Sequence, residues 1–201
     1  MTEPIEIGRL LRSSTLGCVV GCRVEQTNAP ALGELVNIPL DKGYTIYGLV
    51  DDIHIDNDGT VGHLALIPDL PEEVVLDNRA NRVVPVEVSV LFVGYRQGNQ
   101  IRHLLPPRPA LSLEKIYTCS DEELVAFTGA GRFGYFRHVL RNQLVPTGEI
   151  LAAHLRQAGA AQAAAGHPEW ITAAEKELIT LLRDDHAALM NVLSALSDSG
   201  F

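Results

Sequence analysis

Hydrophobic and polar residues alternate along much of the first hundred residues. The clearest case is residues 84–92, where valine or phenylalanine occupies every second position and Glu87 and Ser89 fall between them. A period of two is that of a β-strand with one buried face. Further apolar or alternating stretches predict short strands at residues 5–11, 18–25, 35–40, 44–55, 61–67 and 100–104. Turn-forming residues separate them, such as Asp-Lys-Gly at 41–43 and Asn-Asp-Gly at 57–59.

Short strands joined by hairpin-type turns favour a closed antiparallel β-barrel or a β-sandwich over a parallel sheet, because no long crossover helix separates them. The composition then changes at residues 106–109, Pro-Pro-Arg-Pro, which cannot extend a strand ladder. We therefore predict an α+β protein. Its N-terminal small closed antiparallel β-barrel covers residues 1–110 and is followed by a C-terminal helical segment.

Signals for short helices follow the proline-rich stretch. Ser120 and Glu123 have the spacing of a capping box, and they predict a helix that stops by Gly129. A second short helix is predicted at residues 135–143. Together these elements make residues 111–148 a linker with short helices.

Longer helices are predicted in the C-terminal part. One covers residues 149–157, with a continuation through residues 158–165 left open by Gly159, and a second capping box, Thr172 with Glu175, begins the last helix. Apolar residues recur along that helix at helical spacing, namely Leu178, Leu182, Leu189, Val192, Leu193 and Leu196. Residues 149–201 are therefore predicted to form a helical hairpin with an apolar seam.

The formal net charge of -9 is distributed unevenly. Residues 1–78 contain 4 basic and 13 acidic side chains, residues 79–141 contain 9 and 5, and residues 142–201 contain 3 and 7. Pairing within one chain is one explanation, and head-to-tail contact between unlike patches of two subunits is another. A negative total disfavours nucleic-acid binding by the whole surface, so nucleic acid would be bound only through a local basic patch.

The sequence has no sign of a membrane or secretory protein. No apolar run approaches the roughly 18 residues that a membrane span needs, and the N-terminus lacks the basic and apolar regions of a signal peptide. We expect a cytoplasmic protein with no membrane partner. Its three cysteines do not make a disulfide framework, and Cys18 and Cys22, on one strand face, are expected in the core.

Motifs of catalysis and cofactor binding are weak. Gly129, Gly131 and Gly134 match the G-x-G-x-x-G spacing of dinucleotide-binding loops, but a predicted helix leads into them where such a loop needs a strand. We interpret them as a helix end and a linker. No lysine follows a glycine as in a P-loop, and the seven histidines show no metal-ligand spacing. We predict no cofactor and no metal, and surface or turn positions for most histidines.

Cys119 is the candidate nucleophile. It directly precedes a predicted helix start, where a thiol pKa is lowered, and His138 would act as its base. No third group can be named that orients the pair, so a buried structural cysteine is the favoured interpretation. A small-molecule carrier or cryptic enzyme is a third hypothesis, and we predict that the chain is not an enzyme.

Three segments, in order along the chain, resemble a known family. They are IGRLLRSST at 7–15, LGELVNI at 32–38 and IYGLVDDI at 46–53. Together they resemble the HAS barrel, the small β-barrel at the N-terminus of HerA-type hexameric DNA-translocating ATPases and in the catalytic-head subunits of rotary ATP synthases. The similarity covers residues 5–110. It implies a non-catalytic barrel that packs against neighbouring barrels in a ring, here without the ATPase domain of the translocases.

The resemblance and the charge pattern predict a protein-interaction module that self-associates or docks on a separate ring ATPase. The residues expected to face the partner are three arginines and three seam leucines, Arg132, Arg137, Arg141, Leu182, Leu189 and Leu196. The alternative is a nucleic-acid-binding barrel, because arginines interleaved with Tyr135 and Phe136 suit contacts with phosphates and bases. Arginines with aromatic residues are equally typical of a protein-interface anchor.

Overall fold

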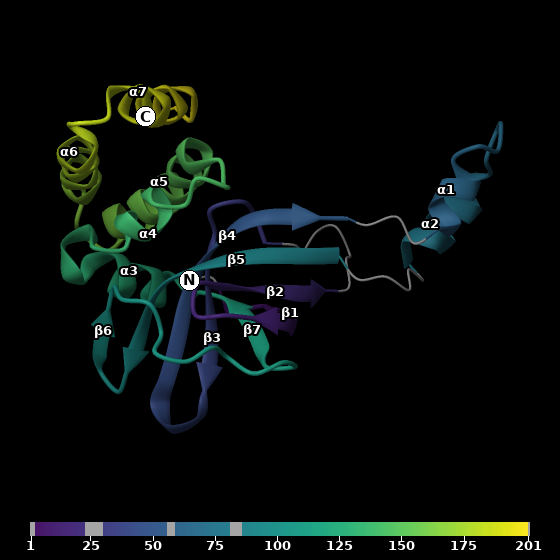
Figure 1. The fold of residues 1–201 in the computed structure, drawn as a ribbon, viewed down its shortest axis with the longest axis horizontal. Helices are drawn as coiled ribbons and strands as arrows, with labels where there is room; N and C mark the ends of the chain where they lie inside the picture. Colours follow the sequence, from purple (N-terminus) through teal and green to yellow (C-terminus); the bar gives the residue numbers. More distant parts are fainter. Residues whose placement is uncertain (1–2, 23–29, 56–58, 81–85, 201) are drawn as a thin grey trace.

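The computed structural model describes residues 3–22, 30–55, 59–80 and 86–200. Figure 1 shows a β-barrel, helices packed on one side of it, and a pair of short helices that stands apart. The strands are β1 (Glu6–Ser13), β2 (Gly17–Cys22), β3 (Leu35–Leu40), β4 (Tyr44–His54), β5 (Val86–Gln97), β6 (Gln100–Arg102) and β7 (Lys115–Thr118). The α-helices are α1 (Thr60–Leu64), α2 (Glu72–Ala80), α3 (Asp121–Gly129), α4 (Phe136–Leu140), α5 (Thr147–Ala164), α6 (Trp170–Leu182) and α7 (His186–Asp198). Two 3₁₀ turns are η1 (Asp41–Gly43) and η2 (Gly131–Phe133).

The sheet closes into an antiparallel barrel, which confirms the predicted fold class. The strands follow one another in the order β2-β1-β7-β3-β4-β5, and pairing of β2 with β5 closes the ring. β6 pairs with the end of β5 outside the ring. β7 lies between β1 and β3, so the barrel includes residues beyond the predicted boundary at 110. The predicted linker at 111–148 contains this strand together with α3 and α4.

Two hydrophobic cores lie on the two sides of the barrel wall. The first fills the barrel and includes Val86, Val88 and Val90 of β5. The second lies between the barrel and the helices α3–α7 and includes Leu91 and Val93 of the same strand. β5 therefore alternates between buried and half-buried residues at its start, and it becomes continuously buried where both of its faces are covered.

The predicted strand at residues 61–67 is wrong, because α1 and the turn after it occupy these positions. The barrel closes without this segment, so a strand here would have no neighbour for its backbone groups. A helical turn satisfies them locally, as in the hydrogen bond from Ala65 N to Val61 O at 2.9 Å. The other predicted strands are present with shifted ends, and residues 23–25 and 84–85 of the predicted strands lie outside the described residues.

The predicted capping box at the start of α3 is confirmed. Glu123 N donates to Ser120 Oγ at 3.2 Å, and Ser120 N donates to Glu123 Oε2 at 3.3 Å. Asn37 Nδ2 donates to the same carboxylate oxygen at 2.9 Å. The capping carboxylate therefore also joins α3 to β3 of the barrel.

The C-terminal part contains α5, α6 and α7, where the sequence predicts a hairpin of two helices. α6 begins at Trp170, so Thr172 lies inside the helix and the second predicted capping box is wrong. The indole nitrogen of Trp170 donates to Thr128 O at 3.2 Å, and this tertiary contact anchors the helix start. The last predicted helix is interrupted because the Asp185 side chain accepts from Ala188 N at 3.0 Å and caps α7. In the described part of the chain, no helix has the length and hydrophobicity to cross a membrane.

Gly33 joins the barrel to α5. Its φ is +76°, its N–H donates to Val50 O at 2.8 Å, and its carbonyl oxygen accepts from His154 Nδ1 at 3.2 Å. A β-carbon at this position would lie 2.7 Å from the carbonyl oxygen of Ile150. Gly43 has a similar φ of +70°, but nothing lies within 4 Å of its β-carbon position. A side chain at Gly33 would therefore meet both backbone strain and a steric clash, whereas a side chain at Gly43 would meet backbone strain alone.

We expect Gly33→Ala to lower the free energy of unfolding by about 2 kcal/mol, because left-handed strain adds to a collision with α5. Gly43→Ala introduces the strain alone and should cost about 1 kcal/mol. Urea unfolding of both variants measures the difference. Equal losses would contradict the close packing of Gly33 on α5.

Candidate interaction surface

Four arginines lie on chain segments that meet at His103, at one end of the molecule. We call Arg102, Arg132, Arg137 and Arg141 the basic patch. Arg102 precedes His103 in the chain, and the Arg137 guanidinium donates to the His103 carbonyl oxygen. Figure 1 places β6, α3 and α4 on the side of the barrel away from α1 and α2. The patch therefore lies at the end opposite to these two helices.

α4 holds two of the arginines in place. Arg137 lies in α4 and Arg141 directly follows it. The two residues are one helical turn apart, so they lie on the same side of the helix. His138 Nε2 donates to the His103 carbonyl oxygen at 3.2 Å, beside the guanidinium of Arg137. Burial, with the charges on Arg137 and Arg141, lowers the pKa of His138. The histidine is therefore a neutral hydrogen-bond donor within a cationic surface.

The glycine-rich segment after α3 places Arg132 in solvent. As predicted, a helix leads into these glycines. A β-carbon at Gly131 would lie 2.7 Å from His103 Nδ1, so the segment needs glycine there. Arg132 and Phe133 then adopt left-handed backbone, with φ of 48° and 58°. Arg132 is exposed, while the ring centroid of Phe133 lies 5.4 Å from that of Trp170.

No carboxylate among the described residues forms an ion pair with the basic patch. In those residues, the ion pairs of lysine and arginine lie elsewhere, at Arg12–Glu87, Lys115–Glu6 and Arg183–Asp184. Arg137 is half-buried and the other three patch arginines are exposed. Two leucines flank these elements in the sequence, Leu104 after His103 and Leu144 beyond α4, with 48% and 95% of their surface exposed. Exposed guanidinium groups with apolar neighbours are typical of a protein-interaction surface.

The chain itself covers several of the other residues that the sequence singled out. Leu182 and Leu196 are buried in the core between the barrel and the helices, and the half-buried Leu189 packs against it. Tyr135 and Phe136, the aromatic neighbours of the patch arginines, are fully buried. Stacking on nucleic-acid bases needs exposed aromatic rings, so these two rings are not available for it.

Two of the seven histidines are buried, whereas the other five are exposed or half-buried, in agreement with the prediction for most of them. His154 of α5 is fully buried: its Nδ1 donates to Gly33 O, and its Nε2 accepts from Tyr135 Oη at 3.0 Å. Burial lowers the pKa of His154 to about 4. His103 Nε2 donates to Phe127 O at 3.0 Å, and burial lowers its pKa as well. Both neutral rings link the barrel to the helices.

Cys119 and His138 do not form a catalytic pair. The Cys119 thiol lies 3.7 Å from Asn37 Nδ2, whereas His138 contacts the His103 carbonyl oxygen. Burial and the neighbouring Glu123 carboxylate raise the pKa of the thiol well above its usual value. The thiol stays protonated, so the candidate nucleophile is not activated.

A shallow groove of about 380 Å³ lies between the turn that joins β1 to β2, β4, β5 and the end of α4. Asp51 lines it, and burial raises the pKa of this carboxyl to about 6. Cys18 also lines the groove, and burial with the charge on Asp51 raises its pKa to about 12. A single carboxyl and a protonated thiol do not make a nucleophile and base. The described residues contain no group of three or more His, Cys, Asp and Glu side chains that could hold a metal ion.

No protein-family model matches the chain, and no curated protein sequence matches it. The resemblance to the HAS barrel therefore stays a prediction, and it is based on three short segments of the sequence. In the structure these segments fall on β1, on β3 with the turn before it, and on β4, all of them barrel strands.

Proposed function

We propose that this protein is a non-enzymatic assembly module: a HAS-like barrel that binds other protein subunits, by self-association or by docking on a ring ATPase. The basic patch carries the proposal. Its guanidinium groups have no carboxylate partner among the described residues, and exposed leucines flank the elements that hold them. Such a surface suits an acidic protein partner with apolar side chains of its own.

Nucleic acid is the alternative partner of the same patch, because arginines bind phosphates. Two observations favour a protein. The rings of Tyr135 and Phe136 beside the arginines are buried, and the exposed side chains of Leu104 and Leu144 gain nothing from phosphates. The net charge of -9 adds long-range repulsion from a nucleic acid.

Light scattering coupled to size exclusion, at low and moderate salt, tests the proposal. We expect the wild-type chain to form an oligomer at low salt. Arg132→Glu combined with Arg141→Glu, at two exposed positions, should lower the mass to that of a single chain. Arg156→Glu changes an exposed arginine on α5 outside the patch, so this matched control should keep the wild-type mass.

Fluorescence anisotropy with labelled single-stranded and double-stranded DNA separates the two partners. DNA binding that falls steeply with salt and is lost in the double variant would replace the assembly proposal with nucleic-acid binding. A single-chain mass at every concentration, without DNA binding, would restrict the protein to docking on a separate ring ATPase.

A further inference from the structure

The two short helices between β4 and β5 lie outside both hydrophobic cores. We call residues 59–80 the arm. Figure 1 shows the arm standing away from the barrel, and neither hydrophobic core includes a residue of it. Four of its large apolar side chains are exposed, namely Leu66, Ile67, Val74 and Leu76, the first to 81%. Exposed apolar side chains at this density mark an interaction surface.

Helices as short as these do not stabilise themselves. α1 spans 5 residues and α2 spans 9, whereas isolated helices below about 12–15 residues are marginal in water. Most of the stability of a protein helix comes from packing of its apolar face. The arm receives no such packing from the two cores of its own chain. It therefore needs another surface to cover it.

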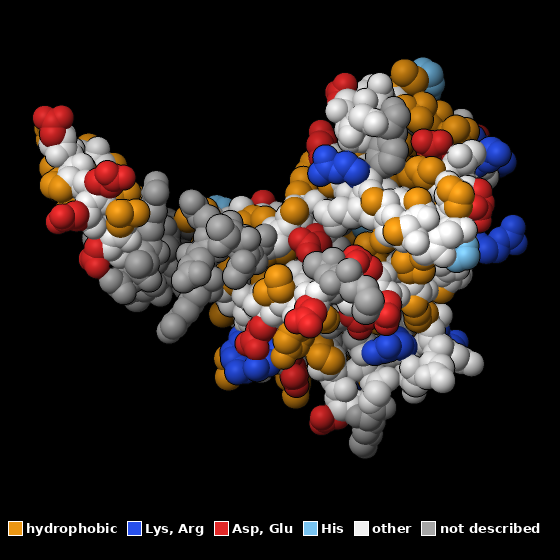
Figure 2. Space-filling model, turned by 180° about the vertical axis from the view of Figure 1, so that it is seen from behind, with side chains coloured by type: hydrophobic (Ala, Val, Ile, Leu, Met, Phe, Trp, Pro, Cys, Tyr) orange, Lys and Arg blue, Asp and Glu red, His pale blue; other side chains and the backbone are white. Residues whose placement is uncertain are grey.

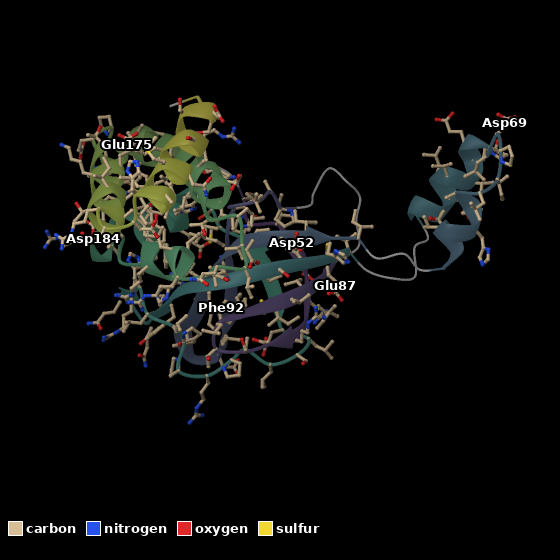
Figure 3. All side chains as sticks on the ribbon, turned by 45° about the horizontal axis from the view of Figure 1, so that its top comes forward. Asp52, Asp69, Glu87, Phe92, Glu175 and Asp184 are labelled. Carbon is tan, nitrogen blue, oxygen red and sulfur yellow. The ribbon has the colours of Figure 1, made fainter. Side chains whose placement is uncertain are left out.

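Charge indicates what that surface is. Residues 59–80 contain four acidic residues and one arginine. Asp69, Glu72 and Glu73 are exposed, and Figure 2 shows acidic and apolar side chains mixed over the arm. Figure 3 labels Asp69 at the outer end of the arm, far from the barrel. A complementary surface is basic and also exposes apolar side chains.

The basic patch has both properties. Its arginines lack carboxylate partners among the described residues, and Leu104 and Leu144 are exposed beside the elements that carry it. The patch and the arm lie at opposite ends of the molecule (Figure 1), so the arm of one copy would meet the patch of another copy. We propose that the arm of one chain docks on the basic patch of a second copy of this chain. This inference rests on the proposed assembly function and names the two surfaces that form the contact.

Contact between two different surfaces is heterologous. Each docked pair leaves one arm and one patch unused, so the contact propagates into a closed ring or an open filament. Carboxylates on one side then face guanidinium groups on the other. Reversing the charge on one surface should therefore be compensated by reversing the charge on the other.

Two full-length variants test the pairing. The arm variant carries Glu72→Lys with Glu73→Lys. The patch variant carries Arg102→Glu, Arg132→Glu and Arg141→Glu, at the three exposed patch positions, so that acidic side chains outnumber the remaining Arg137. Each variant alone brings like charges together, so we expect a single-chain mass by light scattering at low salt. In an equal mixture every arm finds a patch of opposite charge, and we expect the mass of the wild-type assembly to return. Such rescue also shows that both variants are folded.

Glu149→Lys is the matched control. Glu149 is exposed and lies in the first turn of α5, as Glu72 and Glu73 lie in the first turn of α2, so each charge reversal acts on a helix dipole in the same direction. This control should keep the wild-type mass. If the patch variant loses assembly but the arm variant keeps it, docking of the arm is overturned while the proposed assembly function still holds. A mixture that stays at single-chain mass would overturn the pairing, and a wild-type chain that never assembles would overturn self-association itself.

Discussion

Replacing Phe127 by alanine should lower the free energy of unfolding by about 3–5 kcal/mol, the largest loss that we expect from one substitution. Phe127 of α3 is fully buried where the helices meet the barrel. Its ring centroid lies 4.8 Å from those of Tyr47 and His103, and 5.4 Å from that of Tyr135. Removing the ring leaves a cavity between two packed layers that collapse only in part.

Urea unfolding measures this loss. Trp170 is the only tryptophan and lies in the same core, so its fluorescence reports the helical layer, while far-UV circular dichroism follows the whole fold. Leu111→Ala, at a side chain that is 71% exposed and lies outside the arm and the basic patch, is the control and should cost less than about 0.5 kcal/mol. A loss for Phe127→Ala no larger than that of the control would contradict its place at the centre of the interface.

Acidification should remove about 3 kcal/mol of stability through His154. The folded chain lowers the pKa of this buried imidazole from 6.5 to about 4. Between these values the unfolded chain binds a proton that the folded chain does not, so acid favours unfolding. The contribution of His154 is fully present above pH 6.5, and it is lost as the pH falls towards 4.

Other groups titrate in the same range. Burial also lowers the pKa values of His103 and His138, which adds to the loss. Asp51 acts in the opposite direction, because its pKa is raised to about 6 and its stabilising proton is lost as the pH rises through that value. The effect of His154 is therefore measured as the difference in the free energy of unfolding between wild type and His154→Gln at each pH. The stability gap between the two should narrow from about pH 7 to about pH 4.5, and a constant gap would contradict the neutral buried imidazole.

Elements with strong local signals were predictable. The capping box of Ser120 and Glu123 begins α3, and the alternation in β5 follows the barrel wall. β7 was missed because it has four residues and only Ile116 among its apolar side chains is buried, so it is a strand only because β1 and β3 flank it. The segment at 61–67 ends in a short apolar run, which suits a strand or a helix alike, but the barrel has no place for a strand there.

The candidate site was predictable in part. Arg132, Arg137 and Arg141 form one segment of the sequence, but Arg102 joins them only because the next residue, His103, is contacted by α4. The burial of His154 does have a sequence signal: it lies with Ile150, Leu151 and Leu155 on the apolar face of α5. Helical spacing applied to the histidines would have identified a core position.

The sequence by itself determined the strand-rich first half, the helical second half, the start of α3 and the separation of acidic from basic segments. Each of these depends on residues close together in the chain, where spacing is enough to fix the outcome. Only the tertiary structure decided which strands close the barrel, which leucines are covered and which arginines have no carboxylate partner in the described part of the chain. Burial and ion pairing depend on groups that folding brings together from distant positions, as it does for Gly33 with His154 and for His103 with Arg137.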